Sequence, residues 1–376
     1  MPKSFQPDWT EKPPKKNSFR SIFKWGDPKE FKHPSHEWYQ MLKETFGMTD
    51  ADFKKPRFEG NEKVTIDHAI SLSADDIKAI TKIAGKKNVS TDDYSRVKYS
   101  HGKTVDEAVD LRHQKVLHVP DIVVHPKDKN DVRKIVGYCN TRKIPIYIFS
   151  GGSSVTFGLN APNAGIMLVM STHMNKLNNI NELNQTATVQ PGMFGPAYEE
   201  ALNNAPKKFN VKHRYTCGHF PQSFEFSTVG GWVVTLGSGQ ASTYYGDAYD
   251  IVFAQEYVTP AGTFKTLEYP ATATGPKIND IMKGSEGAFG ILVEVTMKIF
   301  RYMPKNRQRF GFMFPSWEAA VSASREITQA EFGLPAVFRI SDPEETEVGL
   351  KLFGIHGSPV DKIMTFRGYK PMERCL

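Results

Sequence analysis

Residues 144–154 read I-P-I-Y-I-F-S-G-G-S-S, an apolar strand that runs into a glycine-rich turn. Glycine adopts positive φ without a steric penalty, and a turn of this kind at a strand end can present several backbone amides to an anion. Ser153 and Ser154 add two hydroxyl groups to the same turn. The stretch predicts a phosphate-binding loop, and a plain turn between strands is the alternative.

The segment before this stretch completes a strand-helix-strand unit. Residues 122–124, I-V-V, form a short buried strand, and Asp128 is placed to cap the helix that follows. The apolar residues of that helix recur at helical spacing, which predicts one face packed on a sheet: Val132, Ile135, Val136 and Cys139. Two strands joined by a helix are expected to run parallel with a right-handed crossover.

Later segments add strands and helices in an order that predicts an α+β fold. We expect strands at residues 166–170, 187–190, 251–258 and 290–300, and a helix entered through Pro196. In the last of these strands apolar residues alternate strictly, which predicts one buried face. This strand is expected to close a domain near Arg301.

The N-terminal part is predicted to precede that domain as a separate segment. Residues 1–20 carry few apolar groups and are expected to form a disordered arm. Helical structure is expected from Ile22 to about residue 88, including a helix over residues 75–84. Aromatic residues are expected to anchor it: Phe23, Trp25, Trp38 and Tyr39.

The C-terminal part begins a further unit. From Phe310 we expect a strand to residue 314, a helix from Ser316 to about residue 333, a strand over 336–340 and a helix from Asp342. The sequence then stops, and residues 361–376 read as a connection into further structure. This last domain is therefore expected to be incomplete.

Composition fits a globular protein of two or three domains, because 39% of the 376 residues are apolar and 24% are charged. The net charge of +7 is compatible with an anionic ligand, but no basic cluster is interleaved with stacking aromatics, so nucleic acid is not an expected partner. No signal peptide or apolar run of about 20 residues is visible. The chain does not end in Ser-Lys-Leu, so no peroxisomal signal is read, and an intracellular, by default cytoplasmic, location is expected.

Two further glycine-rich elements follow the first, F-E-F-S-T-V-G-G-W at residues 224–232 and G-S-E-G-A-F-G at residues 284–290. Paired glycines at a helix start cost about 1 kcal/mol each relative to alanine, so something is expected to lie close to that backbone. A flat cofactor ring and close packing of the helix on a strand are the two candidates. The first loop opens no helix and lacks the G-x-x-x-x-G-K pattern, which excludes a nicotinamide-type turn and a nucleotide P-loop.

Other catalytic patterns are missing from the sequence. The histidines form no HExxH motif, the segment Gly237-Ser238-Gly239 lacks the spacing of a nucleophile elbow, and Cys139, Cys217 and Cys375 have no metal-ligand spacing. Neither a metal site nor acyl transfer through a side-chain nucleophile is expected.

Taken together, the three glycine-rich elements resemble the flavin-binding segments of the vanillyl-alcohol oxidase (PCMH-type) family of FAD enzymes, and within it most of all the alkylglycerone-phosphate synthases. The resemblance runs from Lys24-Trp25-Gly26, through His101-Gly102 and Pro120-Asp121, to Arg339. It implies a two-subdomain FAD-binding domain at residues 96–302, with its core at 116–302, after an N-terminal segment at 1–95. The beginning of an α+β substrate cap follows at 303–376.

The resemblance also implies which residues meet the cofactor. The pyrophosphate would be held by Ile148, Phe149, Ser150, Gly151, Gly152, Ser153 and Ser154. The flavin would be lined by Gln222, Ser223, Phe224, Glu225, Phe226, Ser227 and Thr228, and by Thr235, Leu236, Gly237 and Ser238. The adenosine side would be supported by Glu286, Gly287, Ala288, Phe289, Gly290, Ile291 and Leu292. Arg339 would hold a substrate anion, with a surface ion pair as the alternative.

Some members of the family attach the flavin covalently through a histidine just after the paired glycines. Ser153 stands at that place, so non-covalent FAD is expected, and Cys217 is expected to be a core thiol rather than an attachment point.

For the reaction, the resemblance implies exchange of the acyl chain of acyl-dihydroxyacetone phosphate for a fatty alcohol, as in ether-lipid synthesis. An FAD-dependent D-2-hydroxy-acid dehydrogenase or oxidase, acting on lactate or glycolate, remains an alternative, as does a flavin-binding module that needs a partner. The candidate partners are a small anionic substrate, a lipid or membrane surface, and a second copy of the chain.

Overall fold

The predicted strand-helix-strand unit forms in the computed structural model, which describes residues 12–23, 26, 35–54 and 58–376. A four-stranded sheet has the order β1 (Val89–Ser90), β2 (Ile122–Val124), β4 (Ile166–Val169), β3 (Ile146–Phe149). Both β2 and β3 pair in parallel with β4, which lies between them. The predicted parallel arrangement is therefore confirmed, and β3 with its glycine turn is one of the two edge strands.

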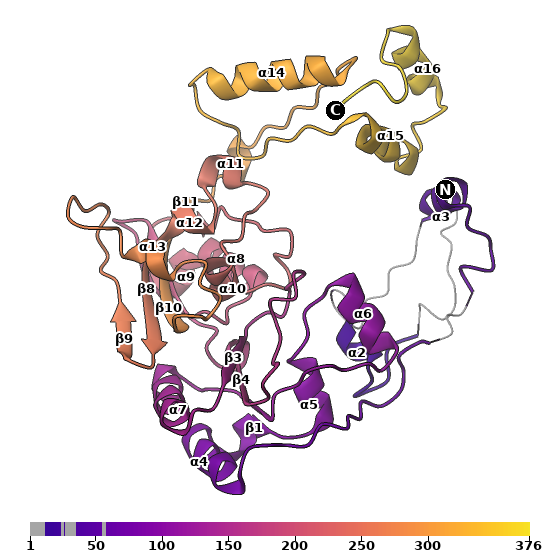
Figure 1. Ribbon diagram of the computed structural model, residues 1–376. Coiled ribbons are helices and arrows are strands. Elements are labelled where there is room, and N and C mark those ends of the chain that lie inside the picture. Colours follow the sequence, from indigo (N-terminus) through magenta and orange to yellow (C-terminus); the bar gives the residue numbers. More distant parts are fainter. Residues whose placement is uncertain (1–11, 24–25, 27–34, 55–57) are drawn as a thin grey trace. The chain divides into compact units, whose positions relative to one another are not determined.

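Helix α7 (Lys129–Arg142) begins where the sequence predicts. The Asp128 side chain accepts hydrogen bonds from the backbone amides of Asn130 and Asp131, which satisfies two free donors of the first turn. The predicted apolar face is buried together with strands of the parallel sheet and helix α4 (Ala74–Ala84). Figure 1 shows α4 and α7 side by side next to this sheet.

A second, antiparallel sheet has the order β5 (Leu177–Asn181), β6 (Thr186–Val189), β10 (Ile291–Lys298), β8 (Val252–Thr259), β9 (Gly262–Lys265). The expectation that β10 buries one face is wrong. Its pairing with β8 shifts register between Leu292 and Glu294, so Ile291 and Val293 enter the core of α4 and α7. Val295 and Met297 enter the other core. As the central strand, β10 is covered on both faces.

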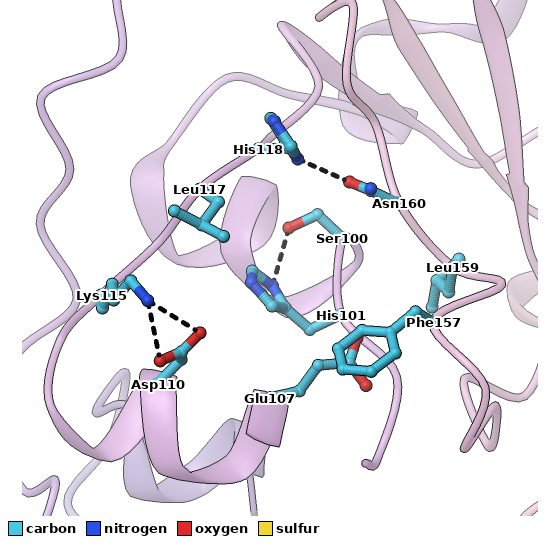
Figure 2. Close-up of a pocket in the computed structure, with 10 residues that line it drawn as sticks. All are labelled: Ser100, His101, Glu107, Asp110, Lys115, Leu117, His118, Phe157, Leu159 and Asn160. Atoms are coloured by element: carbon cyan, nitrogen blue, oxygen red, sulfur yellow. Dashed lines mark hydrogen bonds and ion pairs between the residues drawn. The ribbon is translucent and has the colours of Figure 1, made fainter. Parts of the chain in front are cut away.

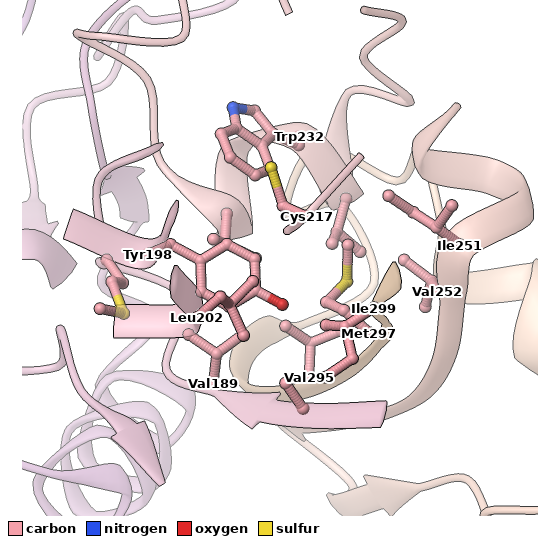
Figure 3. Close-up of a cluster of buried hydrophobic side chains, with 14 of the residues drawn as sticks. Val189, Tyr198, Leu202, Cys217, Trp232, Ile251, Val252, Val295, Met297 and Ile299 are labelled. Carbon is pink, nitrogen blue, oxygen red and sulfur yellow. The ribbon is translucent and has the colours of Figure 1, made fainter. Parts of the chain in front are cut away.

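That other core lies between the antiparallel sheet and several helices. It includes buried residues of α8 (Gly195–Asn203), α9 (Ala205–Phe209), α10 (Val229–Val234) and α12 (Ala248–Ile251). Figure 3 shows Trp232, Tyr198 and Met297 in this cluster. Each large apolar side chain buried here contributes about 1.5–3 kcal/mol, so the helix that carries Gly230 and Gly231 is firmly anchored by Trp232.

The N-terminal segment is more ordered than expected. Ser18 and Phe19 are fully buried, and α2 (Arg20–Phe23) packs with α6 (Val105–Arg112), so the expected disordered arm is wrong for Ser18, Phe19 and Arg20. Residues 1–11 and Trp25 lie outside the described residues. In α3 (His36–Phe46), Tyr39 is buried as expected, whereas Trp38 is 39% exposed and does not anchor the helix.

The C-terminal part forms helices but not the expected strands. Helices α14 (Trp317–Gln329), α15 (Pro343–Leu352) and α16 (Pro359–Phe366) are each capped by the residue before them, Ser316, Asp342 and Ser358. Residues 310–314 and 336–340 are not strands, because a strand needs a neighbour to pair with. Phe314 only exchanges two backbone hydrogen bonds with Cys375, of 2.8 and 3.0 Å.

Shorter elements complete the described chain: α5 (Asp93–Lys98), α11 (Ser242–Tyr245), α13 (Asn279–Met282), the pair β7 (Tyr215–Thr216) and β11 (Phe300–Arg301), and 3-10 turns η1 (Lys86–Asn88), η2 (Met170–Thr172) and η3 (Pro304–Asn306). The chain divides into a large unit, residues 14–28 and 60–302, and a small unit, residues 1–13, 29–59 and 303–376. The finer domain boundaries stay a prediction. No helix among the described residues is long and apolar enough to span a bilayer.

Candidate functional site

The glycine loop, residues 150–154, leaves β3 with a backbone that only glycine can adopt comfortably. Gly152 has a φ of +67°, and a Cβ atom there would lie 2.2 Å from the ring of Phe149. All five residues of the loop are half-buried. The loop therefore keeps its backbone close to the strand and leaves its amides and hydroxyls accessible to a ligand.

The second glycine-rich element lies directly against this loop. A Cβ atom at Gly151 would lie 2.8 Å from the carbonyl oxygen of Phe226 and 3.2 Å from the backbone nitrogen of Thr228. The hydroxyl of Thr228 donates a 2.7 Å hydrogen bond to Ser150 Oγ. Ser150 in turn donates to the carbonyl oxygen of Pro191 over 3.3 Å. The first and second elements thus form one surface.

The two paired glycines at the start of α10 are explained in different ways. A Cβ atom at Gly230 would lie 2.5 Å from the side chain of Pro191, so close packing explains this glycine. At Gly231 the nearest atom would be the Thr228 hydroxyl at 3.4 Å, an ordinary contact, so packing does not require this glycine. Of the two explanations left open by the sequence, packing holds at Gly230 and an approaching ring remains for Gly231.

The third element joins the same surface. A Cβ atom at Gly287, where φ is +88°, would lie 2.7 Å from Ile148 Cδ1 in β3. The amides of Gly284 and Glu286 donate to the carbonyl oxygens of Val233 and Val234 over 3.1 and 3.0 Å. Three segments that are far apart in the sequence therefore converge at the carboxyl end of β3.

Non-glycine residues in this surface adopt a rare backbone conformation. Phe157, Leu236 and Glu286 have φ values of +56°, +51° and +48°. A left-handed backbone is uncommon for such residues and occurs where the surroundings impose it, often at ligand sites. Phe157 and Leu236 are 55% and 38% exposed, and Phe289 is 58% exposed, so apolar side chains border the site in solvent.

Some of the predicted contact residues are exposed, whereas others have side chains that a ligand cannot reach. Among them, Gln222, Glu225, Thr235, Ser238 and Ala288 are exposed. Ile291 and Leu292 are buried in the two cores, and Gly290 packs against Val258 and Thr259. Gly290, Ile291 and Leu292 therefore support the site through the backbone at the start of β10 and not through accessible side chains. The assignment of individual residues to parts of the cofactor stays a prediction.

His219 belongs to the site and was missed in the sequence. It is fully buried, its ring stands edge-on to Trp232 at 5.3 Å, and its Nε2 atom has no hydrogen-bond partner among the described residues. A Cβ atom at Gly237 would lie 4.0 Å from that Nε2, so the free nitrogen is directed at the segment 235–238. Burial lowers the pKa of His219 to about 4. In the sequence, the only feature that could have pointed to His219 was its position between Cys217-Gly218 and the second glycine-rich element.

Cys217 and Arg339 are the two other residues to which the sequence analysis gave alternative roles. Cys217 is buried, its thiol donates to the carbonyl oxygen of His219 over 3.1 Å, and burial raises its pKa well above the usual range, which describes an inert core thiol. Arg339 is exposed and forms an ion pair with Glu345. It lies in the small unit, so its role toward a substrate stays a prediction. No metal-binding cluster occurs among the described residues.

A small pocket opens beside the continuation of the glycine loop. Figure 2 shows His101, Glu107 and Phe157 around it, with Lys115 paired to Asp110 and His118 bonded to Asn160. Burial lowers the pKa of His101, whose Nδ1 lies 2.9 Å from Ser100 Oγ. The pocket is lined by residues of the segments 100–118 and 157–160.

Comparison with known proteins relates these features to FAD-binding proteins. A family model for the FAD binding domain matches residues 120–268. Alkyldihydroxyacetonephosphate synthase of Caenorhabditis elegans is 35% identical over 293 residues, which are 74% of this chain and 47% of the relative. The same enzyme of Dictyostelium discoideum is 32% identical over 260 residues, 68% of this chain and 41% of the relative. The chain thus spans about half the length of the curated relatives it matches.

Solved structures agree with this placement. A structure of alkyldihydroxyacetonephosphate synthase matches with a TM-score of 0.72 and 27% identity, over 83% of this chain and 56% of that chain. p-Cresol methylhydroxylase with substrate bound matches with a TM-score of 0.57 and 15% identity, over 82% of this chain and 61% of that chain, and shows the fold alone.

The residues present fit FAD. Converging glycine backbones provide a cradle that side chains would fill, and His219 Nε2 is a buried polar atom that lacks a partner within the described chain. The non-covalent attachment of the cofactor stays a prediction. Residues 120–268 match the FAD binding domain, the chain shares its α+β fold with a solved alkyldihydroxyacetonephosphate synthase, and its cofactor is FAD.

Proposed function

We propose that the chain acts in an alkylglycerone-phosphate synthase reaction, in which the acyl chain of acyl-dihydroxyacetone phosphate is exchanged for a fatty alcohol. The observation that carries the proposal is the identity of 30–35% to synthases of three organisms over 68–74% of this chain. Glycolate oxidase subunit GlcD of Bacillus subtilis is 23% identical, and the D-lactate dehydrogenase of Arabidopsis thaliana is 28% identical over 56% of the chain.

Bound FAD supplies an electron-accepting ring system beside the substrate. The amides and hydroxyls of residues 150–154 would bind the pyrophosphate, and Thr228 would keep this loop against α10. His219 is neutral at pH 7 because its pKa is about 4. Its Nε2 can therefore accept a proton from a reacting group, or donate a hydrogen bond in the other tautomer, toward the segment 235–238. Arg339 would pair with the substrate phosphate in place of Glu345.

An anaerobic absorbance titration of the FAD-loaded protein tests this proposal. Acyl-dihydroxyacetone phosphate is expected to perturb the flavin spectrum without lasting reduction, since the exchange is redox-neutral overall, and D-lactate is expected to leave the spectrum unchanged. Bleaching of the flavin by D-lactate would instead identify a hydroxy-acid dehydrogenase. A parallel assay with a radiolabelled fatty alcohol measures the ether product directly.

A further inference from the structure

The glycine loop rests on a backbone segment outside the predicted cofactor contacts, Gly102–Lys103. The Lys103 amide donates a 2.6 Å hydrogen bond to the carbonyl oxygen of Ser154. A Cβ atom at Gly102 would lie 2.5 Å from the same oxygen. Gly102 has no left-handed φ, so this close approach to Ser154 is the reason for a glycine here.

Glu107 fixes the segment on both sides of Lys103. Its carboxylate accepts the amide of Gly102 at Oε1 over 2.8 Å and the amide of Thr104 at Oε2 over 3.0 Å. Thr104 completes a capping box at the start of α6, since its hydroxyl accepts from the Glu107 amide over 3.0 Å. Glu107 is buried, so these charge-assisted bonds hold the Lys103 amide toward the loop.

The side chain of Lys103 links this segment to α2. Its ammonium group is mostly buried and donates to the carbonyl oxygen of Ile22. Helix α2 packs on α6, where the Arg112 guanidinium lies 5.2 Å from the centre of the Phe23 ring. Phe19 and Ile22 are buried in a cluster with Leu111. The N-terminal segment is therefore anchored to the same helix that carries Glu107.

The N-terminal segment also reaches the other end of the loop. A Cβ atom at Gly26 would lie 3.5 Å from the ring of Phe226. The carbonyl oxygen of Phe226 in turn lies 2.8 Å from the Cβ position of Gly151. One continuous path of contacts runs from Ile22 through Lys103 to Ser154, and another runs from Gly26 through Phe226 to Gly151.

We propose that residues 18–23 and Gly26 together with Lys103 form a strap that positions the glycine loop for the FAD pyrophosphate, with Lys103 as its central positioning residue. A buried ammonium group is costly unless it is compensated. Because the backbone of Lys103 contacts Ser154, the ammonium lies within about 10 Å of the loop, a distance over which its charge still acts on a phosphate. The role concerns cofactor binding and does not depend on which substrate the enzyme uses.

The variant Lys103→Met distinguishes a role in positioning the glycine loop from a role in the stability of the fold. Methionine keeps the length of the side chain and removes the charge and the bond to Ile22. The Kd for FAD, measured by flavin fluorescence titration, is expected to rise by about tenfold, the effect of one charge-assisted hydrogen bond. The thermal midpoint of the FAD-free protein is expected to change by only a few degrees, because the removal of a charge that is costly to bury offsets the lost bond to Ile22. Lys103→Arg is expected to recover most of the affinity.

The matched control is Lys87→Met, since Lys87 is exposed in the 3-10 turn η1 and lies away from this path. It is expected to bind FAD like the unmodified protein. If Lys103→Met binds FAD with unchanged Kd, the proposal is overturned. A second outcome also overturns it. In that outcome, the FAD affinity of Lys103→Met falls in proportion to a loss of stability of the FAD-free protein, and Lys103→Arg recovers neither the affinity nor the stability.

A second pair of variants tests the backbone contact. Gly102→Ala would force its methyl group into Ser154 and is expected to weaken FAD binding by tenfold or more, since the loop must shift. Gly137→Ala is the control, because a Cβ atom there meets nothing within 4 Å. Unchanged FAD affinity of Gly102→Ala would overturn the strap as the device that positions the loop. Both pairs read cofactor affinity without substrate, so they can fail while the proposed synthase reaction stands.

Discussion

The hydroxyl of Thr228 donates a 2.7 Å hydrogen bond to Ser150 Oγ, across 78 residues of sequence. The same oxygen accepts the amide of Gly231 over 3.3 Å and caps helix α10. Thr228 is fully buried. One side chain thus ties the glycine loop to the start of the helix against which the flavin is expected to lie.

Replacement of Thr228 by valine keeps the shape and removes both hydrogen bonds. We expect the free energy of unfolding to fall by about 1–2 kcal/mol, from the lost cap and the lost hydrogen bond to Ser150 Oγ. Urea denaturation of the FAD-free protein measures this. Thr141→Val on α7 is the control, because its hydroxyl is exposed and bonds only within its own helix. Equal effects of the two variants would contradict the tie between loop and helix.

Gly152→Val is expected to abolish FAD binding. The left-handed backbone disfavours valine, and its Cβ would meet the Phe149 ring at 2.2 Å, so the loop must change conformation. Equilibrium dialysis with FAD measures the loss. Gly311→Val has open space and is expected to bind normally. Stoichiometric FAD in the Gly152 variant would show that the loop is a plain turn and does not bind the pyrophosphate.

His219 is expected to make the stability of the protein depend on pH. Its folded pKa of about 4 lies below the unfolded value of about 6.5, so the unfolded chain binds the proton more readily. The stabilising contribution is complete above about pH 6.5 and is lost as the pH falls toward 4, by about 3 kcal/mol in total. Urea denaturation at pH 7, 6 and 5 should show a weaker decline in His219→Gln. Parallel curves for both proteins would refute the assignment.

Arg374 is expected to hold the small unit together. It is fully buried, and its guanidinium pairs with Asp361 over 2.6 Å and with Glu347 over 3.1 Å. Arg374→Met removes the buried guanidinium from two buried carboxylates, which keep only the imidazole of His356 beside them, a cost of about 3–5 kcal/mol. Hydrogen exchange over residues 303–376 should accelerate strongly in this variant. Lys370→Met, an exposed residue paired with Glu373, should exchange normally. Unaltered exchange in Arg374→Met would show that the cluster is dispensable.

Acid precipitation of the FAD-loaded protein is expected to release intact FAD. Ser153 stands where related enzymes carry the attaching histidine and offers no attachment chemistry, and the thiol of Cys217 is buried with its pKa raised. A yellow supernatant with the mass of FAD confirms this. Colour that stays with the precipitated protein would demonstrate a covalent link.

The sequence by itself determined the local elements of this protein. Asp128 and the spacing of Val132, Ile135 and Val136 define α7, and the residues around Gly152 and Gly287 predict tight loops at strand ends. Caps, helical periodicity and glycine clusters act within a few residues, so they can be read from neighbours in the chain.

Only the tertiary structure decided how these elements meet. It placed β4 between β2 and β3, and it turned Val295 to another core than Val293 through a register shift in β10. It left residues 336–340 outside any sheet, and it directed His219 Nε2 at the segment 235–238. Strand pairing, burial and an unsatisfied nitrogen depend on partners that are distant in sequence. No local pattern records them, because their energy comes from contacts that exist only in the folded chain.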